Sequence, residues 1–494
     1  KSNGYQFTTY GYSSDPLKVS NVDFINPYPT FFTGNLQSIP GGPSFNDRTN
    51  RFISEYSNFV YIRKERYLLS ASARRDGSNI FGVNTNDKWK PLWSVGAGWV
   101  LSKESFYGVE QLPYLKIRTT YGYGGNVDVS KSALPVARYF SNSSITGFPV
   151  ARISSINNPS LRWEQSRQIN LALDFSSKRN ILTGSVDFYF KKGTDLYGES
   201  AYDYTTYGAS NEILQNIASM KGKGLDIVLN SKNIDHTFKW YSTVLFNYNE
   251  SKTTKFLSPS AQKLTSLLGG GNSIMPVVGK PLYGIVAYSW GGLDKEGNPQ
   301  GLINGELTTD YSALAVSSAK DAIQSGTLKY VGSGTPKYFG SIINTFSWRA
   351  ISLTANISYK FSYCFLKPSI NYYMLIYNGM GHSDYGKRWQ KPGDELITNV
   401  PKSDYPNNNS MRDDFYTLSE VNVLRADHIR LQYINLAYKF MNNKIGSNLK
   451  DVEVYCNLSN VGILWRSNRE KLDPDYVNTI SPSFSWALGI RANF

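Results

Sequence analysis

Residues 351–361 read Ile-Ser-Leu-Thr-Ala-Asn-Ile-Ser-Tyr-Lys-Phe and alternate an apolar side chain with a polar one at every step. Successive side chains of a β-strand point to opposite faces, so this stretch has one apolar face and one polar face. The helical repeat of about 3.6 residues does not fit the pattern. The stretch therefore predicts a β-strand with one side in an apolar environment and the other side in a wet one.

The same alternation returns along most of the chain and predicts about fifteen strands, with ends accurate to about two to four residues. A change of phase inside one of them, between Leu431 and Ile434, predicts a β-bulge. The predicted strands are 51–62, 66–75, 92–101, 114–123, 165–176, 181–192, 219–231, 236–251, 280–291, 298–304, 336–347, 350–362, 428–440, 450–459 and 483–494.

The connections between these strands fall alternately into a short set and a long set, and every long one exceeds every short one. A soluble β-sandwich has no reason to sort its loops in this way, whereas an outer-membrane barrel has short periplasmic turns and long extracellular loops. We therefore predict an all-β fold, a transmembrane antiparallel β-barrel. The short set is 63–65, 102–113, 177–180, 232–235, 292–297, 348–349 and 441–449. The long set is 76–91, 124–164, 193–218, 252–279, 305–335, 363–427 and 460–482.

The composition is compatible with this fold and excludes a helical membrane protein. Mean hydropathy is −0.37, and no stretch approaches the ~18–20 apolar residues that a membrane-spanning helix needs. The formal net charge is +14 over 494 residues. Lysine and arginine occur only singly or in pairs, so the charge does not indicate a nucleic-acid partner; it favours contact with anionic lipid headgroups or anionic solutes.

The C-terminal segment alternates in the same way and ends on an aromatic residue. One interpretation is a last strand that closes any β-sheet. The other is an outer-membrane assembly signal, since the pattern resembles the one that outer-membrane proteins present to their insertion machinery. The second interpretation places the C-terminus in the periplasm. The signal residues would be Phe484, Trp486, Leu488, Ile490 and Phe494.

Several short blocks of sequence resemble the SusC-like branch of TonB-dependent transporters, the outer-membrane nutrient importers of Bacteroidetes. They extend over roughly residues 50–494 and follow the order that they have in that family. The chain departs from that family after Asp294, where residues 302–306 replace an acidic, glycine-rich run. The blocks include Arg75-Asp76-Gly77-Ser78, Trp93-Ser94-Val95-Gly96-Ala97-Gly98-Trp99, Ser102-Lys103-Glu104-Ser105-Phe106, Asn158-Pro159-Ser160-Leu161-Arg162-Trp163-Glu164, Val278-Gly279-Lys280-Pro281-Leu282-Tyr283-Gly284, Pro336-Lys337-Tyr338-Phe339-Gly340 and Asp473-Pro474.

This resemblance implies an importer of oligosaccharides or oligopeptides that works with a SusD-like surface lipoprotein as its lid and with the TonB complex. It implies neither a catalytic site nor a cofactor. Family members have a plug domain and a wall of about 22 strands, so residues 51–494 would be the C-terminal part of the barrel. Residues 1–50 would then be an extracellular loop segment. We expect Lys1 to mark a cut in that loop, with an N-terminal, plug-bearing fragment still bound.

Two other functions remain open at this point. A passive porin or adhesin barrel would share the strand pattern but would have no plug. A soluble carbohydrate-binding or carbohydrate-cleaving β-protein would have to pack its apolar strand faces against each other. The pair Asp413-Asp414 could suggest glycoside cleavage, but its place in a long loop favours a solvated or ion-binding role. The three histidines share no metal-binding spacing.

Tyrosines in two of the long loops are the predicted contacts for the substrate or for the lid. Aromatic rings stack on sugars and pack against partner proteins. The alternative is a girdle at the membrane surface or ordinary loop packing. The candidates are Tyr202, Tyr204, Tyr207, Tyr372, Tyr373, Tyr377 and Tyr385.

Overall fold

The computed structural model describes most of the chain. The described residues are 2–6, 8–14, 17–31, 33–41, 44–48, 51–78, 89–126, 135–140, 145–155, 158, 160–201, 212–257, 267–269, 276–316, 319–406, 409–441 and 451–493.

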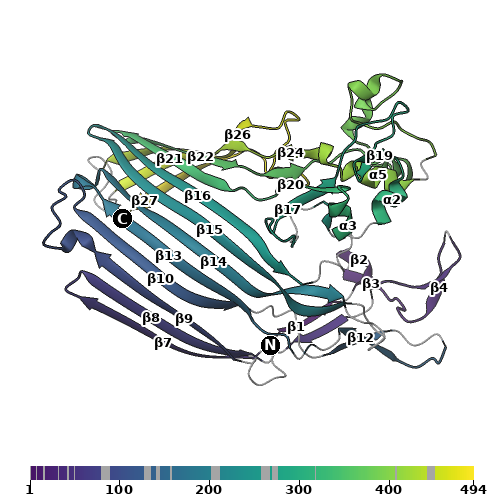
Figure 1. The fold of residues 1–494 in the computed structure, drawn as a ribbon, viewed down its shortest axis with the longest axis horizontal. Helices are drawn as coiled ribbons and strands as arrows, with labels where there is room; N and C mark the ends of the chain where they lie inside the picture. The colour runs from purple at the N-terminus through teal and green to yellow at the C-terminus, as the bar shows by residue number, and fades with distance from the viewer. Residues whose placement is uncertain are drawn as a thin grey trace.

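Thirteen strands form one antiparallel sheet in which each strand pairs with the next one along the chain. The sheet curves into a wall, with β7 and β27 as its two edges (Figure 1). This confirms the predicted antiparallel barrel-type fold, although, within the described residues, two of the fifteen predicted strands lie outside this sheet. The strands are β7 (Phe52–Arg63), β8 (Tyr67–Ser78), β9 (Trp89–Val100), β10 (Tyr114–Asn126), β13 (Glu164–Ser176), β14 (Leu182–Ala201), β15 (Glu212–Asp235), β16 (Phe238–Phe256), β21 (Tyr338–Trp348), β22 (Ile351–Phe361), β25 (His428–Met441), β26 (Asp451–Arg466) and β27 (Ser485–Asn493).

The register gives the sheet one apolar face and one polar face. Leu171 pairs with both Thr119 and Phe188, and it is 53% exposed although it is apolar. On the opposite face the Arg118 guanidinium donates hydrogen bonds of 2.7 and 2.8 Å to the Asp174 carboxylate. Asp187 lies 3.4 Å from the same guanidinium. The polar side chains of one face therefore bind each other, and the apolar side chains of the other face remain uncovered in this chain.

The predicted β-bulge is confirmed. Pairing between β25 and β26 shifts between Leu431 and Tyr433. On the other side of β25, the register with β22 shifts between Asn356 and Ile357. One extra residue in β25 thus reverses the phase of its alternation, as a bulge does.

Two predicted wall strands, 280–291 and 298–304, are wrong. The first contains β17 (Gly284–Tyr288), which pairs with β20 (Leu328–Ser333), and the second contains β18 (Gly301–Ile303), which pairs with β19 (Glu306–Thr308). Every residue of β17 is buried. A continuous apolar run is typical of a strand covered on both faces, so β17 belongs to a protein core and not to a wall with one wet side.

The predicted sorting of loops holds only in part. At the end of the sheet that carries the short turns, residues 64–66, 177–181 and 349–350 connect neighbouring strands. At the other end, 257–337 and 362–427 are long. However, the connection 101–113 on the turn side is longer than 79–88 and 202–211 on the loop side. Strands β8, β9, β14 and β15 continue beyond their predicted ends: β14 and β15 take up most of the predicted loop 193–218, and β8 and β9 take up 76–78 and 89–91 of the predicted loop 76–91.

The long loops carry the short helices, which gather at the end of the sheet opposite the C-terminus (Figure 1). Among the described residues, no helix is long and apolar enough to cross a membrane. The elements of these loops are β11 (Val136–Phe140), β12 (Val150–Ser155), α2 (Tyr311–Val316), α3 (Ala319–Gln324), β23 (Cys364–Leu366), α4 (Tyr372–Asn378), α5 (Ser410–Thr417) and β24 (Val423–Arg425).

The first part of the chain forms three two-stranded antiparallel sheets outside the large sheet: β1 (Ser2–Gln6) pairs with β6 (Ser44–Arg48), β2 (Tyr10–Ser14) with β3 (Leu17–Ser20), and β4 (Pro27–Pro29) with β5 (Leu36–Ser38). They lie toward the loop end of the wall (Figure 1). The division at residue 50 and its assignment to an extracellular segment stay predictions.

The last strand has the predicted alternation. In β27, which pairs with β26, Trp486, Leu488 and Ile490 are 64%, 67% and 74% exposed on one face. Phe484 comes directly before the strand, and Phe494 lies outside the described residues. The role of these residues as an assembly signal stays a prediction.

Candidate functional site

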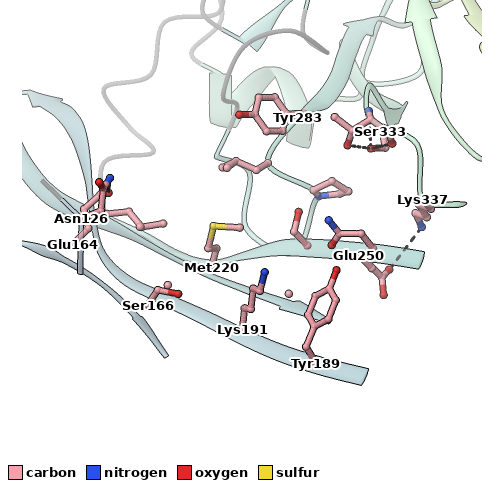
Figure 2. A pocket seen from close by; sticks show the side chains of 18 of the residues that line it. Asn126, Glu164, Ser166, Tyr189, Lys191, Met220, Glu250, Tyr283, Ser333 and Lys337 are labelled. Carbon is pink, nitrogen blue, oxygen red and sulfur yellow. Dashed lines mark hydrogen bonds and ion pairs between the residues drawn. The ribbon is translucent and has the colours of Figure 1, made fainter. Parts of the chain in front are cut away.

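A cavity of about 780 Å³ lies between the polar face of the sheet and the loop 257–337. Its floor is formed by β10 and β13–β16, and Figure 2 shows Tyr189, Lys191 and Met220 pointing from these strands into it. Its roof carries Tyr283 and Ser333, which lie across the cavity from the floor (Figure 2). The alternation of the strands places these floor residues, since each occupies the polar phase of its strand.

The floor of the cavity offers one cation that pairs with no carboxylate among the described residues. The Lys191 ammonium lies 4.6 Å from the centre of the Tyr189 ring, a cation–π contact. Gly224 pairs with Tyr189 across the strands, and a Cβ at this position would overlap the Tyr189 ring. Glycine at 224 therefore lets the ring lie across β15.

The rim of the cavity is held by polar contacts. The Asn126 amide donates a 2.9 Å hydrogen bond to Glu164, which also accepts from the backbone N–H of Tyr197 at 3.1 Å. Lys337 and Glu250 form an ion pair of 3.7 Å (Figure 2). Hydroxyls, an amide, a thioether and an aromatic ring thus line a space large enough for a chain of several units. Such a lining can bind hydroxyl-rich or amide-rich molecules; it has the form of a binding site.

Two long loops share one hydrophobic core above the cavity, which we call the cap core. Its buried members come from 257–337 and from α5 in 362–427. Phe415 stands at its centre, with ring centroids 5.1 Å from Tyr288, 6.3 Å from Trp290 and 5.8 Å from Tyr311. The cap core consists of Leu267, Val286, Tyr288, Tyr311, Leu314, Ala322, Leu328 and Phe415.

Ion pairs near the last residues of β22 and the first residues of β25 attach the loop 467–484 to the wall. The Asp475 carboxylate lies 3.2 Å from Nε2 of the buried His428 and accepts a 2.8 Å hydrogen bond from Lys360. Arg430 donates a 2.5 Å hydrogen bond to Asp473. Burial alone would raise the pKa of Asp475, but the hydrogen bonds from His428 and Lys360 outweigh burial and hold its pKa below the usual 3.8.

Replacing Asp475 by asparagine is expected to loosen this loop by about 1.5 to 3 kcal/mol at neutral pH, because charged hydrogen bonds are lost. In the unmodified protein the pKa is depressed on folding. The stabilisation is therefore present above the usual pKa of 3.8 and is lost only as the pH falls through the lower folded value. Proteolysis of 467–484 should speed up in the variant, with Asn478→Ala as the control. Equal rates of proteolysis in the Asp475 variant and the Asn478 control would contradict the assignment.

The predicted loop tyrosines have different surroundings. Tyr372 is fully buried, and its hydroxyl donates a 2.6 Å hydrogen bond to the Pro401 carbonyl. Burial raises the pKa of Tyr372. It therefore packs the loop and offers no contact surface. Tyr373 and Tyr377 are exposed neighbours on α4, with ring centroids 4.7 Å apart.

Tyr385 is also exposed, with the Arg388 guanidinium 4.0 Å from its ring centre. For Tyr373, Tyr377 and Tyr385 the role in substrate or lid contact stays a prediction. Tyr202, Tyr204 and Tyr207 lie outside the described residues.

The interpretation of the pair Asp413-Asp414 as solvated or ion-binding is wrong for Asp413, whereas Asp414 is exposed. The Asp413 side chain is buried and accepts a 2.7 Å hydrogen bond from the backbone N–H of Tyr373, and the Arg412 guanidinium lies 3.4 Å away. Asp413 thus joins α5 to α4. Among the residues the structure describes, no group of three histidine, cysteine, aspartate or glutamate side chains could hold a metal ion.

Sequence reasoning missed the cavity floor, above all Tyr189 and Lys191. The available signal was the polar phase of β14, where a tyrosine and a lysine follow each other at positions expected to face the interior. It could not show that the loop 257–337 folds back over these two residues, since that placement depends on the cap core.

Comparison with known proteins agrees with this architecture. The sequence profile of the family "TonB dependent receptor-like, beta-barrel" matches residues 2–378. A TonB-dependent receptor of Formosa agariphila is 26% identical over 485 residues, which are 95% of this chain and 46% of that protein. The TonB-dependent receptor SusC of Bacteroides thetaiotaomicron is 27% identical over 235 residues, which are 45% of this chain and 22% of SusC.

Among solved structures, one described as the RagAB peptide transporter aligns with a TM-score of 0.74 at 22% identity, covering 94% of this chain and 49% of that one. This likeness shows a shared fold. The chain spans about half the length of the Formosa agariphila relative. The SusC-like resemblance is confirmed, and the chain belongs to the TonB-dependent receptor β-barrel family of outer-membrane receptors and transporters.

Proposed function

We propose that this chain supplies barrel wall and outer loops to an importer that carries oligosaccharides or oligopeptides across the outer membrane. The importer works with a SusD-like surface lipoprotein as its lid and draws energy from the TonB complex. The observation that carries this proposal is the cavity of about 780 Å³, which has polar strand residues below and a folded loop above. A wall residue such as Lys191 would meet the substrate once it has passed the loops.

The proposed importer function also gives the orientation of this chain in the outer membrane. The cap loops face the outside, while the short turns and the C-terminus lie in the periplasm. Open sheet edges do not occur in the hydrocarbon region, so β7 and β27 pair with further strands on the remaining part of the protein. The length of the Formosa agariphila relative supports this. That part also carries the plug and the contact with TonB.

The exposed apolar surface around α4 supports a protein lid. Tyr373 and Tyr377 are 38% and 53% exposed on a helix held in place by Tyr372, and Met380, which follows the helix, is 62% exposed. Leu396 and Ile397 are more than four-fifths exposed in the same loop. Large apolar residues exposed on a folded loop are typical of a partner contact, and this loop lies at the end of the wall where a lid would dock.

Blocking the cavity tests the import route. Ser166→Trp places a bulky ring at a cavity-lining position of β13, and uptake of labelled oligopeptides or oligosaccharides is expected to fall at least about ten-fold. Leu171→Trp adds the same ring to the apolar face of the same strand and should leave uptake unchanged. Equal uptake by both variants, at equal amounts of protein in the outer membrane, would refute the proposed route.

Dependence on the proton gradient distinguishes a TonB-driven importer from a passive porin. A TonB-driven importer stops when an ionophore collapses the proton gradient of the inner membrane, whereas diffusion through a porin continues. We expect the ionophore to abolish the part of uptake that Ser166→Trp removes. Uptake that persists with the ionophore and is still sensitive to Ser166→Trp would favour the porin and overturn the importer.

A further inference from the structure

A row of basic residues crosses the apolar face of the wall, on four neighbouring strands. Arg167 of β13 pairs directly with Lys192 of β14, which pairs directly with Lys221 of β15, which pairs directly with Lys252 of β16. Like charges directly opposite each other in a sheet are destabilising. Three such pairs in succession indicate that this surface, which we call the basic row, meets a negative charge from outside the chain.

Among the described residues, one carboxylate pairs with the basic row, and it pairs only with Lys252. Glu250 is the nearest acid, and it lies 3.6 Å from Lys223, 3.5 Å from Lys252 and 3.7 Å from Lys337. One carboxylate is thus shared among three ammonium groups. Within the described part of the chain, Arg167, Lys192 and Lys221 form no ion pair, and all three are exposed.

On the same face of the sheet, an apolar band adjoins the basic row on the side of the short turns. Below Arg167 on the outward face of β13 come Ile169 and Leu171, and below Lys192 on β14 come Phe190 and Phe188. Ile169, Phe190 and the basic side chains line one groove of about 420 Å³. A groove with acyl-chain surface at its foot and cations at its top matches a lipid with a phosphorylated head.

Along the membrane normal, the basic row lies at the level of the lipid headgroups of the outer leaflet. Lys192 follows the first residue of β14, Leu182, by ten residues. At about 3.3 Å per residue and a tilt of about 40°, this places it roughly 25 Å above the periplasmic turn, about the height of the apolar band of a barrel.

Beside the row, at the same level, an aromatic cluster joins β9 to β10. The Trp93 ring lies 5.5 Å from Tyr121 and 5.3 Å from Tyr123, and Tyr123 pairs directly with Arg167. Tryptophan and tyrosine gather where the membrane meets water.

We propose that the basic row is a binding site for the phosphate groups of an outer-leaflet glycolipid, whose acyl chains lie on the apolar band below. Arg167 and the lysines hold the phosphates by charged hydrogen bonds, and the lipid removes the repulsion between the paired cations. The proposal rests on the outer-membrane placement of the proposed function. It adds a specific lipid site at the basic row on the outward face of the wall; Lys191, Gly222 and Glu250 line both this groove and the cavity on the other face.

The test measures lipid binding to the full protein, extracted in detergent from its outer membrane and stripped of lipid. The probes are lipid A from the same membrane, the same lipid after enzymatic dephosphorylation, and inorganic phosphate. We expect the phosphorylated lipid to bind at least about ten-fold more tightly than the dephosphorylated one. The combined change Arg167→Gln, Lys192→Gln and Lys221→Gln should remove this preference.

Two control variants keep the result interpretable. Arg167→Lys, Lys192→Arg and Lys221→Arg preserve the charge and should preserve the preference. Lys64→Gln, Lys178→Gln and Arg179→Gln remove the same number of charges at the turn end and should also preserve it. A glutamine variant that still prefers the phosphorylated lipid would overturn the proposal. So would inorganic phosphate that binds as tightly as the lipid, since the site would then serve a soluble anion.

The tests distinguish failure of the proposed lipid site from failure of the proposed import function. Cell fractionation that finds the protein outside the outer membrane defeats both. Protein that is in the outer membrane and passes the cavity-blocking test, but binds both lipids equally, defeats only the lipid site.

Discussion

Replacing Thr119 by arginine is expected to lower the free energy of unfolding of the barrel by about 2 to 4 kcal/mol, because a charge on the lipid face is costly near the middle of the membrane. Thr119 lies on the apolar face of β10, in register with Leu171. The next residue, Thr120, lies on the polar face in register with Asn170. Arginine at Thr120 would point into the polar interior of the barrel, where its cost is expected to stay below about 1 kcal/mol.

This pair of variants is closely matched. The two positions are adjacent, carry the same residue and are both exposed in the structure. Equilibrium unfolding by urea in lipid vesicles measures the difference, and the heat-dependent mobility of the folded barrel on a gel reports assembly. Two variants with equal stability would mean that the apolar face does not contact lipid. A Thr120 variant less stable than the Thr119 variant would reverse the assignment of the two faces.

Removal of the central ring of the cap core is expected to have the second large effect. Phe415→Ala removes a side chain that is 2% exposed and contacts three aromatic rings from the other loop. Such a change costs about 3 to 5 kcal/mol in a well-packed core. The wall should still assemble, because Phe415 belongs to α5 and to none of the wall strands.

Protease treatment of intact cells measures this effect. If opening of the cap limits cleavage, a loss of 3 kcal/mol raises the cleavage rate within 257–337 and 362–427 about a hundred-fold. The control is Met411→Ala, which shortens an exposed side chain on the same helix. Unchanged cleavage in the Phe415 variant would show that the two loops hold their shape without a common core.

Loss of the cap core should also reduce uptake, because the roof of the cavity belongs to it. Tyr283 and Ser333 lie directly before β17 and at the end of β20, and both strands pack residues into the cap core. A variant with fast cleavage and normal uptake would indicate that substrates bind to the floor alone.

The strands of the wall could be predicted from the sequence because the alternation that defines each strand is visible among neighbouring residues. A strand with lipid on one side and water on the other must alternate, so Ile351–Phe361 shows its structure in eleven consecutive residues. Even the bulge near Leu431 is visible as a change of phase. The loop elements follow no such rule. The run Gly284–Tyr288 is apolar throughout because both of its faces are buried, with Val286 and Tyr288 in the cap core, and its sequence therefore resembles that of a wall strand.

The sequence alone determined the antiparallel wall, its two faces and the family, because alternation and ordered blocks are properties of neighbouring residues. Only the tertiary structure decided that two distant loops share one core, that Tyr372 is buried whereas Tyr373 is exposed, and that a cavity lies over Tyr189 and Lys191. It also decided the register that brings Arg167, Lys192, Lys221 and Lys252 into one row. These features depend on contacts between residues far apart in the chain, and such contacts leave no periodic trace in the sequence.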